Sequence, residues 1–181
     1  MTNPTTTLVS APEFTSAMAQ HVSSVCVVTT VYEGKRHGLT ATAMCAVCAT
    51  PPRLLVCVNK SGMSHEMLGK SGVFCVNVLS DHQDKIAKGF AGMLGKTYDR
   101  FSLGEWNELG TGAPVLAGSA AAFDCRLVQV IDQFSHSIMI GEVVAVTNKT
   151  QDPLLYGARK FRNLRKHISE TSGKAEELLL D

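Results

Sequence analysis

The chain has 181 residues, enough for one domain with a full hydrophobic core. Its 17 basic and 16 acidic residues leave a formal net charge of +1, so no overall field draws it to nucleic acid or to an anionic membrane. The sequence contains neither a signal-peptide pattern nor about 18 continuous apolar residues, which a membrane-spanning helix needs. We expect a cytoplasmic protein whose partners are small molecules or other protein chains.

Along the chain, residues 1–11 are rich in Thr, Ser, Pro and Asn and are expected to form a flexible tail before a single domain over 12–168. Ser10 is a suitable N-cap for a short helix, with Pro12 early and with Phe14, Met18 and Val22 at helical spacing. β-branched and apolar runs then predict strands over 25–32, 39–48, 54–59 and 73–79. Between the last two strands, Ser64 is a natural N-cap for one or two helical turns.

The second half of the chain continues this pattern. Residues 81–90 have a helical apolar face of Ile86, Ala87 and Phe90, and Trp106 lies in a Gly-rich loop region. Residues 121–131 and 136–146 predict a long hairpin. The segment 154–168 is basic and keeps a helical period, and 169–181 is expected to be a tail or a docking helix.

This order of elements indicates the fold class. Strands dominate, many are consecutive, and strands and helices do not alternate regularly. The pattern favours a mainly β fold, an antiparallel barrel with a few peripheral helices, over a doubly wound parallel sheet.

Several familiar motifs fail on spacing. GFAGMLGKT (89–97) has one residue too many between its glycines for a phosphate-binding P-loop, and GTGAPVLAG (110–118) lacks GxGxxG spacing. No GxSxG or HExxH occurs.

The six cysteines are expected to remain free thiols, because they are too few for a disulfide scaffold and the cytosol is reducing. Cys45 and Cys48 form a CxxC pair, but we place both in a strand, where residues of odd separation point to opposite faces. They are therefore not expected to meet as a redox pair. The other four lie among Val, Leu and Phe, where a cysteine is a small apolar side chain that fills the core: Cys26, Cys57, Cys75 and Cys125.

A set of segments, in order, resembles the short-chain flavin reductases over residues 14–161: TAT, PPRLLVCVNKS, FCVNVLSDHQ, FAG, APVL, FDC and a histidine before IGEV. One member is the reductase component of 4-hydroxyphenylacetate 3-monooxygenase. The resemblance implies a Greek-key, FMN-binding split β-barrel and a homodimer with the flavin near the subunit interface. It also implies hydride transfer from NADH or NADPH to FMN or FAD, and a monooxygenase that receives the reduced flavin.

The resemblance also implies site residues. Four small residues lie on the strand that passes the isoalloxazine ring, and two more border the flavin further along: Thr40, Ala41, Thr42, Ala43, then Val47 and Cys48. The ribityl chain and phosphate fall to Asn59, Lys60, Ser61 and Ser64. Other cofactor residues are Phe90, Ala91 and Gly92 of the FAG motif, Arg100 and Tyr156. His136 matches a histidine of the nicotinamide site.

The sequence departs from the family at two places. NKSGMSH replaces a common pattern of an arginine and a run of serines, and Phe134 stands where a glycine is common, so that it could narrow the nicotinamide pocket or cover the flavin. The other five histidines are expected at the surface. We assign no catalytic acid or base and no metal site, because the flavin carries the redox step and the protein supplies proximity and orientation.

Two alternatives stay open at this point. In one, FMN remains bound and reduces another acceptor, as in the enzyme that reduces the Co(II) corrinoid cob(II)yrinic acid a,c-diamide. In the other, the chain is a non-catalytic flavin- or haem-binding protein on a split barrel. Neither the choice between FMN and FAD nor that between NADH and NADPH follows from the sequence.

Overall fold

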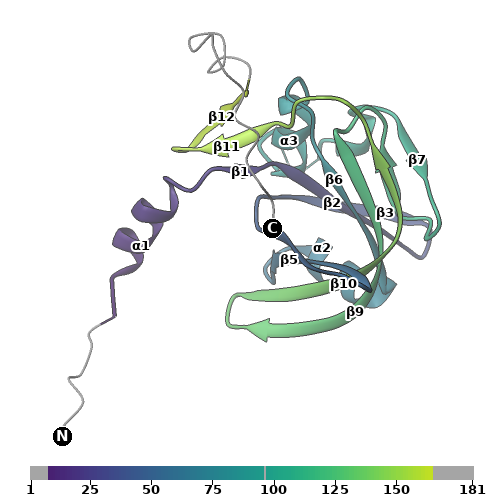
Figure 1. Cartoon of the computed structure of the whole chain (residues 1–181), viewed down its shortest axis with the longest axis horizontal. Coiled ribbons are helices and arrows are strands. Elements are labelled where there is room, and N and C mark those ends of the chain that lie inside the picture. Colours follow the sequence, from purple (N-terminus) through teal and green to yellow (C-terminus); the bar gives the residue numbers. More distant parts are fainter. Residues whose placement is uncertain (1–7, 96, 165–181) are drawn as a thin grey trace, which may run out of the picture.

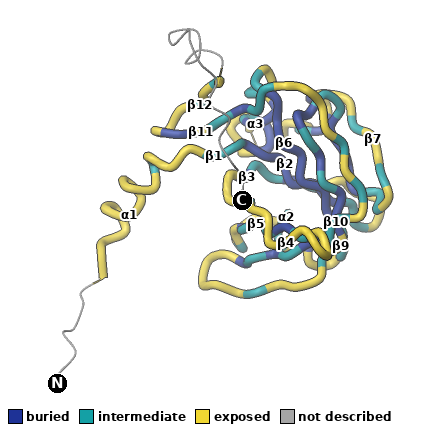
Figure 2. Tube along the Cα trace, in the orientation of Figure 1, coloured by how far each residue is buried: buried dark blue, intermediate teal, exposed yellow. Residues whose placement is uncertain are grey.

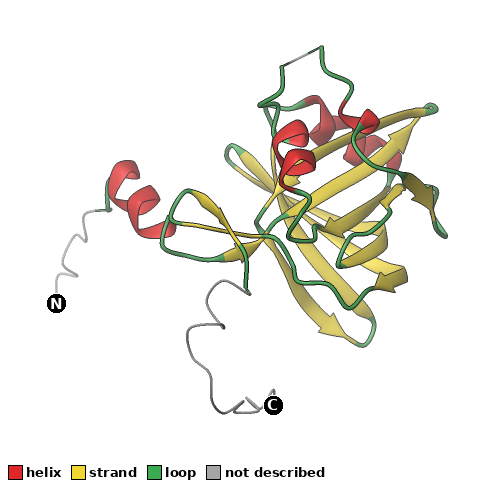
Figure 3. Cartoon of the chain, turned by 90° about the horizontal axis from the view of Figure 1, so that it is seen from above, coloured by secondary structure: helices red, strands yellow, loops and turns green. Residues whose placement is uncertain are grey.

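The computed structural model describes residues 8–95 and 97–164. Its main feature is an antiparallel sheet of seven strands in the order β3–β2–β6–β9–β10–β5–β4 (Figure 1). The strand at one edge, β3, also contacts β5, which is the second strand from the other edge. The sheet therefore curls toward a barrel (Figure 3). The bounds of these strands are β2 Cys26–Tyr32, β3 Lys35–Ala41, β4 Met44–Ala49, β5 Pro52–Asn59, β6 Val73–Val78, β9 Ala121–Gln133 and β10 His136–Asn148.

Two small sheets and a few helices surround the main sheet. The first small sheet has the order β1–β11–β12, and the second pairs β7 with β8. No helix within the described residues has the length and apolarity of a membrane span. The bounds of the peripheral elements are α1 Ala11–Met18, β1 Ser23–Ser24, α2 Met63–Ser71, α3 Asp84–Phe90, the 3-10 helix η1 Arg100–Ser102, β7 Trp106–Glu108, β8 Pro114–Leu116, β11 Leu155–Gly157 and β12 Lys160–Arg162.

The hydrophobic core fills the inside of the curved sheet. Val56 and Val58 of β5 alternate with outward-facing neighbours and pack with Phe74, Val76 and Met139. A second cluster joins the sheet to α3 and η1; its buried members include Leu79, Phe90, Phe101, Leu103 and Leu116. This second cluster supports the side of the barrel on which α3 and η1 lie.

A buried polar group pins β8 to the sheet. The side-chain amide of Asn77 donates to the carbonyl of Val27 (3.1 Å) and to that of Pro114 (3.4 Å), while its oxygen accepts from the Leu116 amide (2.7 Å). Because these donors and acceptors are all paired, the polar side chain is accommodated inside the core.

The α1 helix is the outlying element of the molecule (Figures 1 and 2). Ser10 and Glu13 form a capping box at its start, as the Ser10 signal predicted. None of its residues is buried, and Phe14 and Met18 remain 56% and 49% exposed. Phe14 and Met18 are therefore only partly covered by the described part of this chain.

Most predicted strands are confirmed, but three local predictions are wrong. The strand predicted over 39–48 is two strands, broken at Thr42 and Ala43. Trp106 lies in β7. The N-cap of α2 is Gly62, because the Ser64 hydroxyl donates instead to the carbonyl of Gly38 (2.9 Å).

The helical period over 154–168 also gave a wrong prediction for the part that the structure describes. The described part, up to residue 164, forms the β11–β12 hairpin, in which Ala158 and Arg159 turn the chain with φ of 49° and 60°. Two successive left-handed residues cannot belong to a right-handed helix. The remainder of this segment and the predicted tail at 169–181 lie outside the described residues, as do residues 1–7.

The cysteines require a correction too. A bulge at Val47 shifts the register of β4, so that Cys45 lies opposite Leu55 and Cys48 opposite Arg53. Since Leu55 and Arg53 are two residues apart on β5, both thiols lie on the same outer face of the sheet, and the parity argument was wrong. Both are exposed and free. Cys26, Cys75 and Cys125 are buried as predicted, whereas Cys57 is only half-buried, on the outer face.

Candidate functional site

A pocket of about 350 Å³ lies where β5 ends, between the start of α2 and the end of α3. Its lining comes from β3, the β5–α2 connection, α2, the end of α3 and η1. Seven of the residues predicted from the resemblance line it: Asn59, Ser61, Ser64, Phe90, Ala91, Gly92 and Arg100. The fold thus brings together three segments that are separate in the sequence.

The connection from β5 to α2 presents hydrogen-bond donors to the pocket. The Asn59 side-chain oxygen accepts from the Ser61 amide (2.8 Å), which turns the chain sharply after the strand. The N-cap of α2, Gly62, has no side-chain capping bond. The His65 amide donates to the Gly62 carbonyl (3.0 Å), whereas the amides of Met63 and Ser64 precede the first intrahelical acceptor. These two amides can receive an anion, which the helix dipole also favours.

The carbonyl group of Gly38, a residue of β3 that lines the pocket, links two other lining residues. It accepts from the Ser64 hydroxyl (2.9 Å) and from Arg100 Nη1 (3.1 Å). A Cβ on Gly38 would lie 2.7 Å from the ring of Phe90. Only glycine lets the strand, the aromatic ring and the two polar side chains approach this closely.

Aromatic rings support one wall of the pocket. Phe90 contacts Phe101 and Trp106, with ring centroids 5.0 and 5.3 Å apart. The Arg100 guanidinium lies 5.9 Å from the Phe90 ring centroid. This wall is preorganised, because each ring is fixed by the next.

The predicted small residues of 40–43 do not line this pocket. The Thr40 hydroxyl donates to the Ala87 carbonyl (2.7 Å), which ties β3 to α3, and the Ala41 side chain is buried in the core. Thr42 and Ala43 are exposed in the break between strands. Thr42 lines a different pocket, of about 370 Å³, together with Tyr156.

Two other predicted residues lie away from the main pocket. Val47 and Cys48 are at the end of β4 that pairs with Arg53. Asn59, at the pocket, is six residues further along β5, a distance of roughly 20 Å at the rise of a strand. Within this chain, the structure does not bring Val47, Cys48, Thr42 or Tyr156 to the pocket around Asn59.

The tip of the β9–β10 hairpin borders the pocket. His136 lies directly opposite Asn59, and the Lys60 amide donates to the Ser135 carbonyl (2.9 Å). Phe134, in the turn, is 98% exposed with φ of 46°. In this chain it neither narrows the pocket nor covers it.

His65 is the residue that sequence reasoning missed. It lines the pocket, and its Nε2 lies 2.8 Å from the hydroxyl of the buried Ser137. That hydroxyl donates to Asp132 (2.7 Å), so Nε2 of His65 must carry the proton and donate to Ser137. The available signal was its place next to Ser64 in a predicted first helical turn, but it was assigned to the surface.

Charges extend this connection to Lys60. Its ammonium group lies 3.0 Å from the Asp132 carboxylate. The hydrogen bond from Ser137, followed by the contact with Lys60, holds the pKa of Asp132 below its ordinary value. Lys60 and His65 are therefore tied to the same carboxylate at the hairpin tip.

A second pocket, of about 470 Å³, adjoins the first and shares with it Gly38, Met63, Ser64 and Arg100. Its further lining residues are Arg36, His37, Tyr98, Asp99 and Phe101. Partial burial, followed by the charges of Lys35 and Arg100, lowers the pKa of His37. Nearby positive charge is thus the second cause of this shift, after burial.

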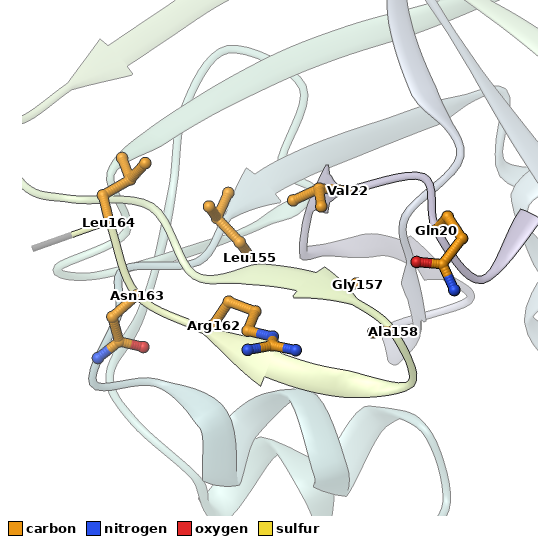
Figure 4. A pocket seen from close by; sticks show the side chains of 8 residues that line it. All are labelled: Gln20, Val22, Leu155, Gly157, Ala158, Arg162, Asn163 and Leu164. Carbon is orange, nitrogen blue, oxygen red and sulfur yellow. The ribbon is translucent and has the colours of Figure 1, made fainter. Parts of the chain in front are cut away.

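Figure 4 shows a further pocket, of about 310 Å³, between the segment after α1 and the β11–β12 hairpin. Its larger apolar side chains are Val22, Leu155 and Leu164. No residue predicted for the site lines it. We therefore place the candidate site in the pocket around Asn59, which offers an aromatic wall, hydroxyls, cations and free amides to a planar ligand with an anionic group.

Sequence comparison finds known proteins that match most of the chain. Residues 18–165 match the family model described as "Flavin reductase like domain". The chain is 41% identical over 164 residues to "FMN reductase (NADH) RutF 2" of Methylorubrum extorquens strain PA1, covering 90% of this chain and 95% of that protein. It is 36% identical over 154 residues to "FMN reductase (NADH) RutF" of Ancylobacter novellus, covering 84% of each.

Solved structures give the same result. The flavin reductase PheA2 matches with a TM-score of 0.80 and 33% identity, covering 86% of this chain and 99% of that chain. A putative flavin reductase from Haemophilus somnus 129PT matches with a TM-score of 0.82 and 35% identity, covering 86% and 100%. The predicted mainly β, split-barrel fold class is confirmed.

Proposed function

Because the chain belongs to the flavin reductase-like family, we propose that it is an NADH-dependent flavin reductase that acts on FMN, with FAD as a second flavin. The observation that carries this proposal is the pocket around Asn59, which unites seven of the predicted residues from three segments. A bound flavin supplies an N5 atom that accepts the hydride of the nicotinamide. The protein's own residues bind and orient the two reactants.

The chemistry of the pocket fits FMN. Its volume of about 350 Å³ is in the range of small-molecule sites. We assign the phosphate to the free amides at the start of α2 and to Ser61, with Lys60 and Arg100 as the nearby cations. Phe90, Ala91 and Gly92, which line the same pocket, would then hold the isoalloxazine.

The nicotinamide is assigned to His136, which is exposed and opposite Asn59 at the rim of this pocket. A side chain at the rim can hold a second reactant over a first that fills the pocket. His65 is added as a polar residue of the wall. Its Nδ1 is the ring nitrogen left to accept from a ligand, since Nε2 donates to Ser137.

We propose further that the chain is a homodimer. The outer faces of β5, β9 and β10 carry a half-buried apolar surface of Leu55, Cys57, Ile131, Ile138 and Ile140. A second copy would cover this surface and the exposed apolar side chains of α1. In a dimer, residues of one copy can also lie near the flavin pocket of the other. This would explain why the family associates with the flavin four residues that lie away from this chain's own pocket: Thr42, Val47, Cys48 and Tyr156.

The oligomeric state is tested by substitution on the outer face. Ile138→Glu is expected to give a monomer in analytical ultracentrifugation, because a charge would be buried at the interface. Val146→Glu, at a position that is 60% exposed, is the control and should leave the dimer intact. A wild-type monomer at micromolar concentration contradicts the dimer.

Related proteins suggest the fate of the product. One structural neighbour is described as BorF, the flavin reductase component of a bacterial two-component tryptophan halogenase, at 29% identity and a TM-score of 0.78. We propose that this chain likewise releases reduced flavin to a separate oxygen-using enzyme. The nature of that enzyme does not follow from the pocket.

The function is tested by following NADH oxidation with FMN, FAD and a Co(II) corrinoid as alternative acceptors. Rapid turnover of free FMN without corrinoid reduction supports the flavin reductase and removes the retained-flavin alternative. A colourless protein that neither binds added FMN nor oxidises NADH contradicts the enzymatic function and leaves the non-catalytic alternative.

A further inference from the structure

We propose that the pocket next to the flavin site, lined by Arg36, Tyr98 and Arg100, binds the adenosine 5′-phosphate half of a dinucleotide. FAD and NADH both carry this group. The inference rests on the proposed function, because it takes the flavin to lie in the pocket around Asn59. It goes beyond that function by naming a second binding site with its own ligand chemistry.

The two pockets adjoin. They share Gly38, Met63, Ser64 and Arg100 as lining residues, so one extended ligand can contact both. Arg100 stands at the boundary, held by its bond to the Gly38 carbonyl (3.1 Å). A diphosphate that joins an FMN half to an adenosine half would pass this guanidinium.

The pocket also carries a positive charge that is held in place, on Arg36. The Arg36 guanidinium lies 4.6 Å from the centroid of the Phe101 ring. Stacking on a ring leaves the N–H edges of a guanidinium free for a phosphate, and it limits the entropy lost on binding. Arg36 and Arg100 thus both offer oriented donors to this pocket.

The other charged groups around the pocket do not cancel this field. Asp99 is the acidic residue of the lining, and its carboxylate accepts from the Phe101 amide (3.0 Å) at the start of η1. Lys35 adds a further cation, whose charge, after burial, lowers the pKa of His37. The balance of Arg36, Arg100 and Lys35 against Asp99 favours a polyanion.

The pocket also has an aromatic ring on which an adenine base can stack. Tyr98 lines this pocket and is 38% exposed. Other rings nearby, Phe90 and Phe101, are buried and packed against each other. Tyr98 is therefore the ring available to stack on adenine, an interaction that also tolerates some variation in geometry.

The test compares ligands that differ only in the adenylate group. The dissociation constants of FMN, FAD and free adenosine 5′-phosphate are measured for the wild type, for Arg36→Met and for Tyr98→Leu. Arg36→Met keeps an aliphatic stem over Phe101, so the aromatic cluster stays packed. Arg126→Ala, on the exposed face of β9, is the control for a lost positive charge.

Loss of a charge-assisted phosphate contact is expected to weaken the binding of FAD and of adenosine 5′-phosphate by about tenfold or more in Arg36→Met. FMN binding should stay unchanged. If NADH is the source of the group instead, its KM with FMN as acceptor rises by a similar factor while the Kd values of both flavins hold. Adenosine 5′-phosphate should then compete with NADH.

Two results overturn the proposal: equal weakening of FMN and FAD, or no change in any dissociation constant or in the KM of NADH. A protein without reductase activity would refute the proposed function, yet the titration with adenosine 5′-phosphate would still decide this site. Absence of adenosine 5′-phosphate binding to the wild type, together with wild-type-like Arg36→Met, counts against it in that case.

Discussion

His136 lies directly opposite Asn59, where the β10 strand begins and the β5 strand ends. The two residues thus join the hairpin tip to the segment that leads into α2. A reactant held by the histidine would meet a ligand held by the residues after Asn59. This relationship gives the assignment of the nicotinamide to His136 a consequence that can be measured.

We predict that His136→Asn raises the KM of NADH by about tenfold, the effect of losing one good polar contact, and leaves the Kd of FMN unchanged. Steady-state kinetics and flavin fluorescence titration measure the two quantities separately. His82→Asn, on an exposed histidine outside the pocket, serves as the control. Unchanged NADH kinetics in the His136 variant would exclude it from the nicotinamide site.

Ser137 connects His65 to Asp132, and its removal should loosen the pocket. Ser137→Ala leaves the His65 N–H without its acceptor, so we expect a loss of about 1 kcal/mol in unfolding free energy and a roughly fivefold weaker FMN affinity. Ser71→Ala removes a hydroxyl bond of 2.7 Å from the other end of α2. This control should lose similar stability and keep the FMN affinity; equal FMN binding in both variants contradicts a role for Ser137.

Gly38→Ala is predicted to be destabilising. The new Cβ would lie 2.7 Å from Phe90 and 3.0 Å from the Val28 carbonyl, and such overpacking costs about 1–3 kcal/mol. Displacement of Phe90 should weaken flavin binding as well. Urea unfolding and quenching of the single Trp106, which contacts Phe90, measure both effects.

The control for Gly38 is Gly69→Ala, in the interior of α2. A Cβ there has no atom within 4 Å, and alanine is the better helix former. This variant should be as stable as the wild type or more so. A Gly38→Ala protein that behaves in the same way would show that the approach of Phe90 is not tight.

Alkaline pH should destabilise the protein through its buried thiols. Burial raises the pKa of Cys26 and of Cys125 to about 12, and that of Cys75 further, from an ordinary value of 9.0. A raised folded-state pKa means that the stability is fully present below about pH 9. It is lost above it, because only the unfolded chain can ionise these thiols.

Each buried thiol adds up to about 1.4 kcal/mol per pH unit to this loss. Urea unfolding at pH 8 and pH 10 measures the slope, and Cys26→Ala should reduce it whatever that variant does to stability at pH 8. Cys45→Ala, at an exposed thiol, should leave the slope unchanged. A flat profile in the wild type would refute the prediction.

Cys45 and Cys48 should each be dispensable for catalysis. Both are exposed free thiols, and flavin chemistry does not require a thiol. Cys45→Ser and Cys48→Ser are expected to retain NADH oxidation within about twofold. If either variant lost activity with folding and flavin binding intact, a thiol mechanism would have to be reconsidered.

Local signals predicted much of this fold. The β-branched runs at 25–32 and 73–79 became β2 and β6, and the Ser10 capping box began α1 where expected. These features depend on neighbours a few residues away. The bulge at Val47 and the left-handed turn at Ala158 change the side-chain directions that a regular strand or helix would give. Valine and alanine are not typical of a bulge or of a left-handed turn, so the sequence contained no signal for either feature.

In the candidate site, too, the sequence predicted what local motifs specify and missed what depends on distant residues. Motif order located Asn59, Ser61 and Phe90, which the fold brings to one pocket. His65 escaped because its partner Ser137 is 72 residues away in sequence. Pairing across such a distance is decided by strand register, which a single sequence does not reveal.

The Gly38 carbonyl, which receives both Ser64 and Arg100, gives this pocket an unusual evolutionary property. This acceptor belongs to the backbone, so it persists when the surrounding side chains change, provided that position 38 stays glycine. Residues such as Arg36 and Tyr98 can then diverge among descendants and change which nucleotide is accepted. The carbonyl that holds Ser64 and Arg100 would meanwhile be inherited unchanged.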